Sequence, residues 1–138
     1  MIQFLTTIPI PVKLDVKEDE RGWLAEIIRK EELVRHQEFG QCMVTTAYPG
    51  CVKGNHYHTR KYEWYCVLKG KARLVLVHNF SGEREEILLN EQQLNTVRIP
   101  PRVSHAIENV GSEMMYLLVY TDESYNEEDP DTFYEKVL

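Results

Sequence analysis

The sequence predicts an all-β fold, in which short strands joined by turns form a sandwich or a closed barrel with little helix. Apolar segments recur at short intervals from residue 41 onward, turn residues separate them, and no long apolar repeat of helical period interrupts them. Many short strands of this kind are typical of sandwiches and barrels. The expected strands span residues 43–48, 63–68, 72–79, 84–89, 95–99, 106–110 and 114–120.

Individual residues indicate the turns and the N-terminal segments. Lys69-Gly70 is a tight connection, so we expect the strands on either side of it to form a hairpin. Residues 1–11 contain two prolines, which cannot donate to a central ladder, and therefore predict an extended edge segment. A polar turn at 19–22 precedes a strand over 23–29, and residues 30–40 predict a single helical turn or a loop.

Two of the expected strands are apolar on both faces, which a half-exposed strand would not be. Residues 64–68 and 74–77 lack the alternation of apolar and polar side chains. One face fills the barrel, so the other face needs a cover as well. A second subunit that packs sheet to sheet would provide it and predicts a homodimer. Burial by the N-terminal segment is the alternative.

Length, charge and cysteine content narrow the class of protein. A chain of 138 residues has room for one core, so residues 1–138 are expected to form a single domain. The net charge of −6 argues against a nucleic-acid binder. No apolar run predicts a membrane span or a signal peptide. Cys42, Cys51 and Cys66 cannot all pair within the chain, and free thiols indicate a cytoplasmic protein.

A cluster of potential metal ligands lies between residues 50 and 70. His56 and His58 are one residue apart, so on a strand they share a face with Cα atoms about 6.6 Å apart. Glu63 follows after room for a turn, and His105 is a fourth candidate further along the chain. Three imidazoles and a carboxylate suit Zn(II), Fe(II), Mn(II), Ni(II) or Cu(II). The sequence therefore predicts a divalent metal site.

The spacing of these residues resembles the two signature motifs of the cupin family. The first motif is matched by Gly50, His56, His58, Glu63 and Gly70, and the second by Pro100, His105 and Asn109. Arg102 and Leu94 stand where the family usually has glycine, departures that affect a turn and none of the four ligands. The resemblance implies a jelly-roll β-barrel with a metal held by the three histidines and the glutamate.

An upstream segment resembles nucleotide-sugar epimerase cupins of the deoxythymidine-diphospho-4-keto-rhamnose 3,5-epimerase type. Arg21 and Glu26 match its Arg-Gly-x-aromatic-x-Glu element, whereas Leu24 replaces the aromatic residue and Trp23 is adjacent. In that family the arginine and its neighbours hold the nucleotide, often across a dimer. The resemblance therefore implies that Arg21 and Glu26 bind substrate.

A closer resemblance covers most of the chain and points to the C-terminal cupin domain of capsular-polysaccharide assembling proteins. It is carried by residues 49–50, 53–58, 61–63, 68–72 and 129–135. It implies a zinc-dependent isomerase that epimerises C3 of a UDP-4-keto-6-deoxy-N-acetylhexosamine for surface polysaccharide. The chain has only the cupin part, so a reductase would be a separate protein. Residues 99–101 and the acidic tail are also similar to sugar 3,4-ketoisomerase cupins, which gives the alternative activity.

Epimerisation next to a ketone needs a base, an acid and a group that stabilises the enolate oxygen. His56 is assigned to the metal and is therefore not free to act as the base. Lys61, beside Glu63, is the candidate enolate stabiliser or acid–base group. Tyr116 and Tyr120 lie near the position that holds the acid in rhamnose-type epimerases. Charged candidates for the diphosphate are Lys53, Arg60, Lys71 and Arg73.

Two other classes of function use the same residues. Three histidines and a glutamate around Fe(II) would also suit a metal-dependent cupin dioxygenase. A sugar-binding cupin without catalytic activity is a further alternative. Tightly bound iron with oxygen uptake would indicate the first, and binding without turnover the second.

Overall fold

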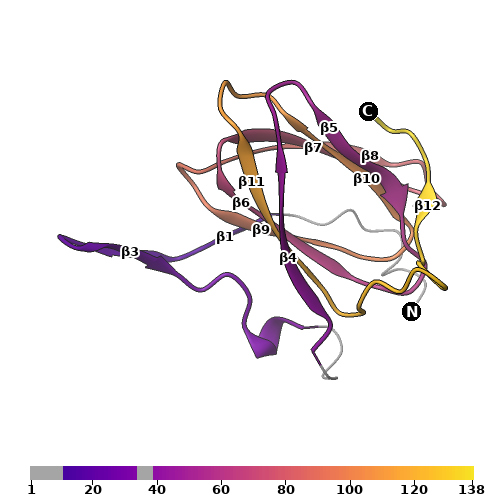
Figure 1. Ribbon diagram of the computed structural model, residues 1–138, viewed down its shortest axis with the longest axis horizontal. Helices are drawn as coiled ribbons and strands as arrows, with labels where there is room; N and C mark the ends of the chain where they lie inside the picture. Colours follow the sequence, from indigo (N-terminus) through magenta and orange to yellow (C-terminus); the bar gives the residue numbers. More distant parts are fainter. Residues whose placement is uncertain (1–10, 34–38) are drawn as a thin grey trace.

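Two antiparallel five-stranded sheets face each other in the computed structural model, which describes residues 11–33 and 39–138 (Figure 1). The first sheet has the strand order β1 (Val12–Lys13), β9 (Asn95–Ile99), β6 (Glu63–Lys69), β11 (Met115–Thr121) and β4 (Gln41–Ala47). The second has the order β12 (Phe133–Tyr134), β5 (Val52–Tyr57), β10 (Val103–Asn109), β7 (Lys71–His78) and β8 (Arg84–Asn90). The predicted all-β class, with short strands arranged in two facing sheets, is confirmed.

A separate hairpin of β2 (Val16–Asp19) and β3 (Gly22–Ala25) projects from the body of the molecule (Figure 1). The strand expected over 23–29 is therefore shorter than predicted, because the chain leaves the hairpin after Ala25. A single 3₁₀ turn at Lys30–Glu32 agrees with the helical turn expected there. The extended edge segment predicted for residues 1–11 lies outside the described residues except for its last residue.

The hairpin predicted at Lys69-Gly70 is wrong, because β6 and β7 belong to different sheets. β6 pairs with β9 and β11, whereas β7 pairs with β10 and β8. Gly70 has φ +97°, and a Cβ there would lie 3.2 Å from the Cα of Met115. Only glycine combines this backbone conformation with so close an approach at the corner where the chain crosses between sheets.

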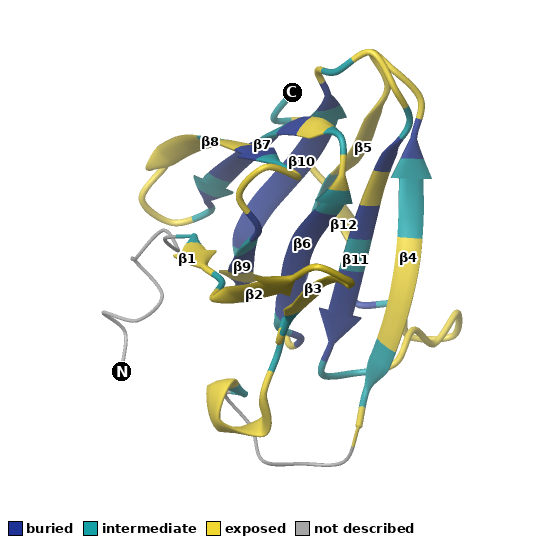
Figure 2. Ribbon diagram, turned by 90° about the vertical axis from the view of Figure 1, so that its left-hand side faces the viewer, coloured by how far each residue is buried: buried dark blue, intermediate teal, exposed yellow. Residues whose placement is uncertain are grey.

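The core lies between the sheets and is formed by alternate residues of the central strands. Leu74, Leu76, Ile107, Val97 and Leu117 are each no more than 2% exposed. Figure 2 shows that burial extends along β6, β7, β10 and β11, whereas β4 at the sheet edge is largely accessible.

The outward faces of β6 and β7 are also buried within a single chain. Cys66 and Val75 alternate with core residues on these strands and are 1% and 0% exposed. Their apolar character therefore does not require a second subunit as a cover, and the homodimer stays a prediction. In the described part of the chain, no helix is long and apolar enough to span a membrane.

The C-terminal segment crosses the outer side of the second sheet and is tied to three of its strands. Phe133 stacks on Tyr57 of β5 with ring centroids 5.4 Å apart. The backbone N–H groups of Glu135 and Val137 donate to the carbonyl and side-chain oxygens of Asn55, both at 2.8 Å. Glu135 also accepts from Ser104 of β10, and Arg84 of β8 donates to the Val137 carbonyl at 3.1 Å.

A β-bulge interrupts β5 next to the histidines. His56 pairs with His105, but Gly54 pairs with Ala106, so Asn55 is the extra residue. Gly54 and Asn55 have φ +98° and +60°. A Cβ on Gly54 would lie 2.8 Å from the His105 carbonyl oxygen. The bulge brings β5 and β10 together where they carry His56 and His105. It leaves no room for a side chain at Gly54.

Replacing Gly54 with alanine should lower the free energy of unfolding by at least about 2 kcal/mol, because left-handed strain adds to a backbone clash. Gly82→Ala is the matched control. Gly82 also has positive φ (+73°), but a Cβ there meets nothing within 4 Å. Urea unfolding measures the free energy of unfolding of both variants. Equal losses in the two variants would show that the close approach at Gly54 does not affect stability.

Candidate metal centre

Four predicted ligand residues converge at one end of the space between the sheets. His56 lies on β5, His58 follows that strand, Glu63 begins β6, and His105 lies on β10. One possible ligand atom from each lies within 4.8 Å of those of the other three. Glu63 and His105 are 4% and 0% exposed. Residues far apart in the sequence, from both sheets, therefore form one compact buried cluster.

Backbone carbonyls fix the orientation of two of the imidazoles. Nδ1 of His58 lies 2.7 Å from the carbonyl oxygen of Asp131, and Nδ1 of His105 lies 3.0 Å from that of Val103. A carbonyl can only accept, so both Nδ1 atoms carry the proton. Their Nε2 atoms point to the same oxygen of Glu63, at 3.0 Å from His58 and 2.9 Å from His105.

This arrangement leaves an electrostatic conflict that a cation would resolve. In the neutral tautomers, each Nε2 lone pair faces a carboxylate oxygen, so a proton or a metal ion must lie between them. Nε2 of His105 is buried and makes no well-oriented hydrogen bond despite its short distance to Glu63. Histidine ligands of metals typically donate their other ring N–H to a carbonyl or carboxylate, as both do here. The residues fit a divalent metal ion.

The protonation of the cluster agrees with this fit. Burial opposes ionisation of Glu63, but the adjacent imidazoles of His105 and His58 hold its pKa far below the usual value. Burial, followed by the neighbouring His105 and His58, lowers the pKa of His56 to about 4. Burial is the largest single influence on His58 and lowers its pKa, but the hydrogen bond to Glu63, the charge of that carboxylate and the Asp131 carbonyl together raise it more, so the net shift is upward. At neutral pH the site offers an anionic carboxylate and a neutral His56.

The cluster lies beside a cavity of about 360 Å³ whose walls are mainly apolar. Ile107, Leu117 and Val119 form part of its wall. Lys61 lines the same cavity and is 4% exposed, with Nζ 6.0 Å from the ring centroid of Tyr125. Lys53 also lines it, and its Nζ donates to Oγ1 of Thr45 at 2.7 Å. Two lysines and the histidine cluster therefore face one apolar space.

Tyr116 and Tyr120 do not line this cavity. Leu117 and Val119, which alternate with them along β11, occupy the inward positions. Tyr116 is 36% exposed, and the Tyr120 hydroxyl accepts from the backbone N–H of Gly40 at 3.2 Å. Neither tyrosine therefore lies where the catalytic acid that was predicted near their position could reach a substrate in this cavity. Tyr65 on β6 does line the cavity, as does Tyr125, and the Tyr65 ring makes an edge contact with His105 at 5.6 Å.

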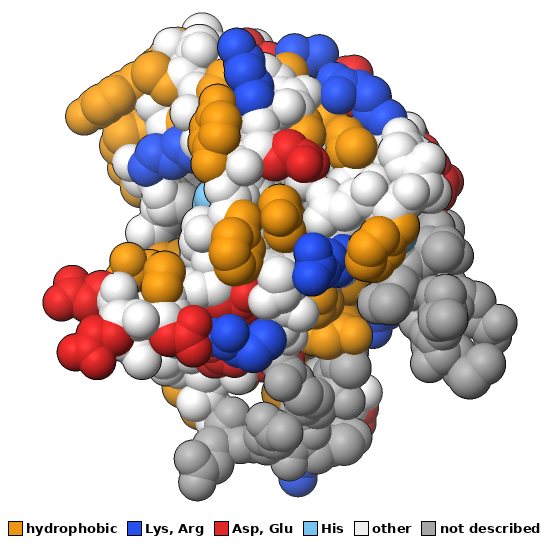
Figure 3. Space-filling model, turned by 90° about the vertical axis from the view of Figure 1, so that its right-hand side faces the viewer, with side chains coloured by type: hydrophobic (Ala, Val, Ile, Leu, Met, Phe, Trp, Pro, Cys, Tyr) orange, Lys and Arg blue, Asp and Glu red, His pale blue; other side chains and the backbone are white. Residues whose placement is uncertain are grey.

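The other predicted substrate-binding residues also lie outside the cavity. Arg21 is in the exposed turn of the β2–β3 hairpin, where its guanidinium pairs with Asp19 at 2.6 Å, and Glu26 follows that hairpin. Arg60 pairs at the surface with Glu123 at 2.7 Å and with Asp129 at 3.2 Å. Figure 3 shows one face of the molecule, on which basic and hydrophobic side chains are interspersed and histidine contributes only small areas.

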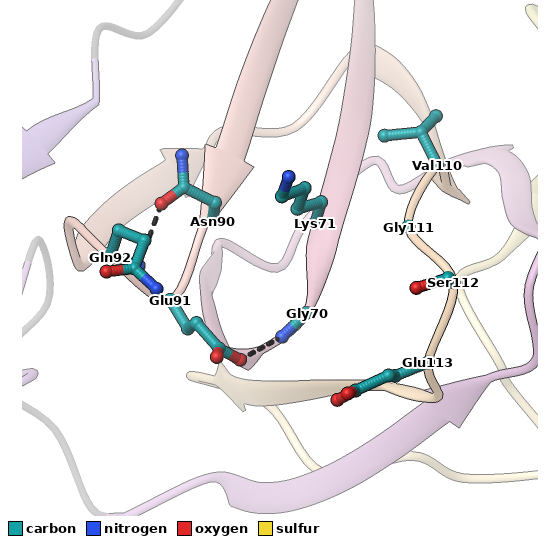
Figure 4. Close-up of a pocket in the computed structure, with 9 residues that line it drawn as sticks. All are labelled: Gly70, Lys71, Asn90, Glu91, Gln92, Val110, Gly111, Ser112 and Glu113. Carbon is teal, nitrogen blue, oxygen red and sulfur yellow. Dashed lines mark hydrogen bonds between the residues drawn. The ribbon is translucent and has the colours of Figure 1, made fainter.

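A second and larger hollow lies at the opposite end of β6 from Glu63 (Figure 4). Three turns surround it, and the carboxylate of Glu91 accepts from the backbone N–H of Gly70 at 2.6 Å. Lys71, predicted as a candidate for the diphosphate, lines this hollow, and Arg73 is paired with Glu86 and Glu108 on the second sheet. The histidine cluster has no member here, so the smaller cavity is the candidate site.

Asp131 contributes to the site although no role was predicted for it. Its carboxylate accepts from the backbone N–H groups of Thr59 and Arg60 at 2.8 and 2.9 Å, and from the Thr59 hydroxyl at 2.5 Å. In the sequence, residues 129–135 contribute to the resemblance to capsular-polysaccharide assembling proteins but do not indicate a contact with His58. The carbonyl contact to His58 depends on where the tail folds back, which spacing along the chain does not indicate.

Comparisons with known proteins agree with this fold. The family model described as the polysaccharide biosynthesis C-terminal domain matches residues 17–133. Spore coat polysaccharide biosynthesis protein SpsL of Bacillus subtilis is 31% identical over 125 residues, 86% of this chain and 82% of SpsL. A UDP-2-acetamido-2,6-beta-L-arabino-hexul-4-ose reductase of Pseudomonas aeruginosa is 30% identical over 132 residues, 96% of this chain and 34% of the reductase.

Solved structures show the same likeness. The capsular polysaccharide assembling protein CapF of Staphylococcus aureus superposes with a TM-score of 0.70 at 31% identity, covering 90% of this chain and 34% of CapF. The chain thus spans about a third of the length of CapF and of the reductase. A dTDP sugar isomerase of Desulfovibrio desulfuricans shares the fold with a TM-score of 0.81 at 18% identity, over 93% of this chain and 83% of the isomerase.

Glu63→Gln should weaken binding of a divalent metal by at least about 100-fold, because the charged ligand is replaced by a neutral amide of the same shape. Metal content by mass spectrometry and competition with a chromophoric chelator measure the change. Glu113→Gln, an exposed glutamate that pairs with Lys69, is the matched control. Equal affinity of Glu63→Gln and wild type would exclude Glu63 as a ligand.

Proposed function

The chain belongs to the polysaccharide biosynthesis C-terminal domain family, and we propose that it is a nucleotide-sugar epimerase of surface polysaccharide biosynthesis. The substrate would be a UDP-4-keto-6-deoxy-hexosamine, epimerised at C3. The observation that carries the proposal is the apolar cavity that is lined by His56, His58 and Glu63 of the cluster and by the buried Lys61. Such a cavity suits the body of a deoxysugar, and a sugar bound there would have charged groups near its ketone.

The cofactor of this proposal is a divalent metal, with zinc first among the candidates. His56, His58, Glu63 and His105 would hold it, a mixed set of nitrogen and oxygen ligands that zinc accepts. When bound, the metal would supply Lewis acidity or would keep the pocket in shape.

The side chains of the cavity would supply one requirement of enolisation, the stabilisation of the enolate oxygen. A C4 ketone acidifies the C3 hydrogen, and the ammonium of Lys61 would stabilise the enolate oxygen that forms. Its apolar surroundings strengthen that interaction, because little water screens the charge. Burial raises the pKa of Tyr65 well above its ordinary value, so its phenol stays protonated and could donate a hydrogen bond to an oxygen of the substrate.

The diphosphate and the nucleotide would lie toward the outer part of the cavity. Lys53 lines the cavity with its ammonium held by Thr45 and is the cation placed to meet a phosphate. Arg21 lies in the turn of the hairpin that projects from the body of the molecule (Figure 1), Glu26 follows this hairpin, and neither residue lines the cavity of its own chain. We therefore propose a homodimer in which they approach the nucleotide held by the partner. The product would pass to a separate reductase.

Proton NMR in D₂O tests the reaction, with UDP-4-keto-6-deoxy-N-acetylglucosamine as substrate and metal-loaded protein. Deuterium should appear at C3 while the ketone stays at C4, because enolisation exchanges that hydrogen with solvent. Migration of the ketone to C3 would instead identify the 3,4-ketoisomerase. No exchange with this sugar or its thymidine counterpart would reject both, and oxygen uptake with iron-loaded protein would then test for a dioxygenase.

Lys61→Met should lower kcat by about 10²–10³-fold, because one stabiliser of the developing oxyanion is lost. Lys53→Met, an identical replacement at the other lysine of the cavity, should act mainly on KM, because a phosphate contact is made equally in the ground and transition states. Steady-state kinetics of the two variants separates the roles. An unchanged kcat in Lys61→Met would remove this lysine from the chemical step.

A further inference from the structure

The tail residue Asp131 contacts the metal-centre region with both its backbone and its side chain. Its carbonyl oxygen is the acceptor that fixes the tautomer of His58, at 2.7 Å from Nδ1. Its carboxylate accepts from three consecutive backbone N–H groups, those of Thr59, Arg60 and Lys61, at 2.8, 2.9 and 3.3 Å. Asp131 therefore contacts both His58, the candidate ligand just after β5, and the turn at residues 59–61 that follows it.

The local backbone makes Asp131 suited to this double role. It has φ +49°, in the left-handed region where aspartate and asparagine are enriched among residues other than glycine. This turn directs the carbonyl toward His58 while the side chain bends back to the turn at 59–61. Asp131 is 2% exposed, so both contacts are made away from water. A bulky or branched residue would strain this conformation.

The same segment is connected to a second ligand of the cluster. Immediately after Asp131 and Thr132, β12 pairs with β5, where Tyr134 is the register partner of His56. Downstream, the backbone of residues 135–138 is hydrogen-bonded to Asn55 in the bulge. The tail thus contacts the chain at or beside both histidines of the His-x-His pair. Figure 1 shows β12 alongside β5 at the edge of the second sheet.

We propose that Asp131 is the positioning residue of the metal centre, which aims Nε2 of His58 at the ion and holds Lys61 at the cavity wall. The inference rests on the metal centre of the proposed function. Groups of this kind, which orient a ligand without touching the metal, usually change metal affinity by about 10–100-fold. The carboxylate acts through the turn at 59–61 and keeps the Asp131 carbonyl in place.

Cobalt(II) serves as the probe, because its visible absorption reports coordination geometry and chelator competition reports affinity. Asp131→Ala should bind Co(II) about 10–100-fold more weakly than wild type, with an altered absorption band. The Co(II) affinity of Asp131→Asn should lie between those of wild type and Asp131→Ala, because asparagine tolerates the left-handed backbone and keeps one accepting oxygen. Glu128→Ala, which removes an exposed carboxylate of the same tail, should match wild type.

The outcomes separate positioning from general stability and from catalysis. Circular dichroism before metal addition shows whether each variant is folded. If Asp131→Ala is unfolded, the Co(II) affinity and absorption spectrum of Asp131→Asn and Thr59→Val test the proposal in its place. Folded variants with the affinity and spectrum of wild type would overturn the proposal. A wild-type protein that fails to bind Co(II) would overturn the metal centre together with it. Normal Co(II) binding without turnover of nucleotide sugars would reject only the proposed epimerase.

Discussion

A buried carboxylate between two imidazoles is the interaction on which the rest of the site depends. One oxygen of Glu63 lies within 3.0 Å of Nε2 of His58 and within 2.9 Å of Nε2 of His105. Leaving such a charge buried and uncompensated costs several kcal/mol. Because Glu63 belongs to one sheet and the histidines to the other sheet or its edge, satisfying this charge also joins the two sheets at this end of the fold.

The backbone around the cluster is adapted to this constraint. The bulge at Asn55 lets β5 approach β10 closely, so that His56 and His105 face each other with ring centroids 4.8 Å apart. The Asn55 side chain is turned toward the C-terminal tail, whose backbone it accepts from. The bulge at Asn55 therefore sets the spacing of His56 and His105. It also binds the C-terminal tail, whose Asp131 carbonyl orients His58.

Charge and apolar surface are distributed unevenly around the cavity. The apolar wall formed by Ile107, Leu117 and Val119 lowers the local dielectric, which strengthens interactions of Lys61 and of the cluster with any charge that develops nearby. Arg60 and Arg73, by contrast, are paired with carboxylates away from the cavity, Arg60 with Glu123 and Asp129. Among the described residues, the buried charged and titratable groups that line the cavity are thus few, namely Lys61, Glu63, His58 and Tyr65.

The sequence by itself determined the all-β class, because strand patterning is local, and the four candidate ligands, because their residue types and spacing form a specific motif. Only the tertiary structure decided the rest. The sequence around Gly70 predicts a hairpin turn, but the packing partners of two neighbouring strands decide whether they pair with each other or belong to different sheets. Tyr116 and Tyr120 fell on the outer side because one residue of register exchanges the faces of a strand. Asp131 acts on His58 through a contact made only when a distant tail folds back, which no local pattern encodes.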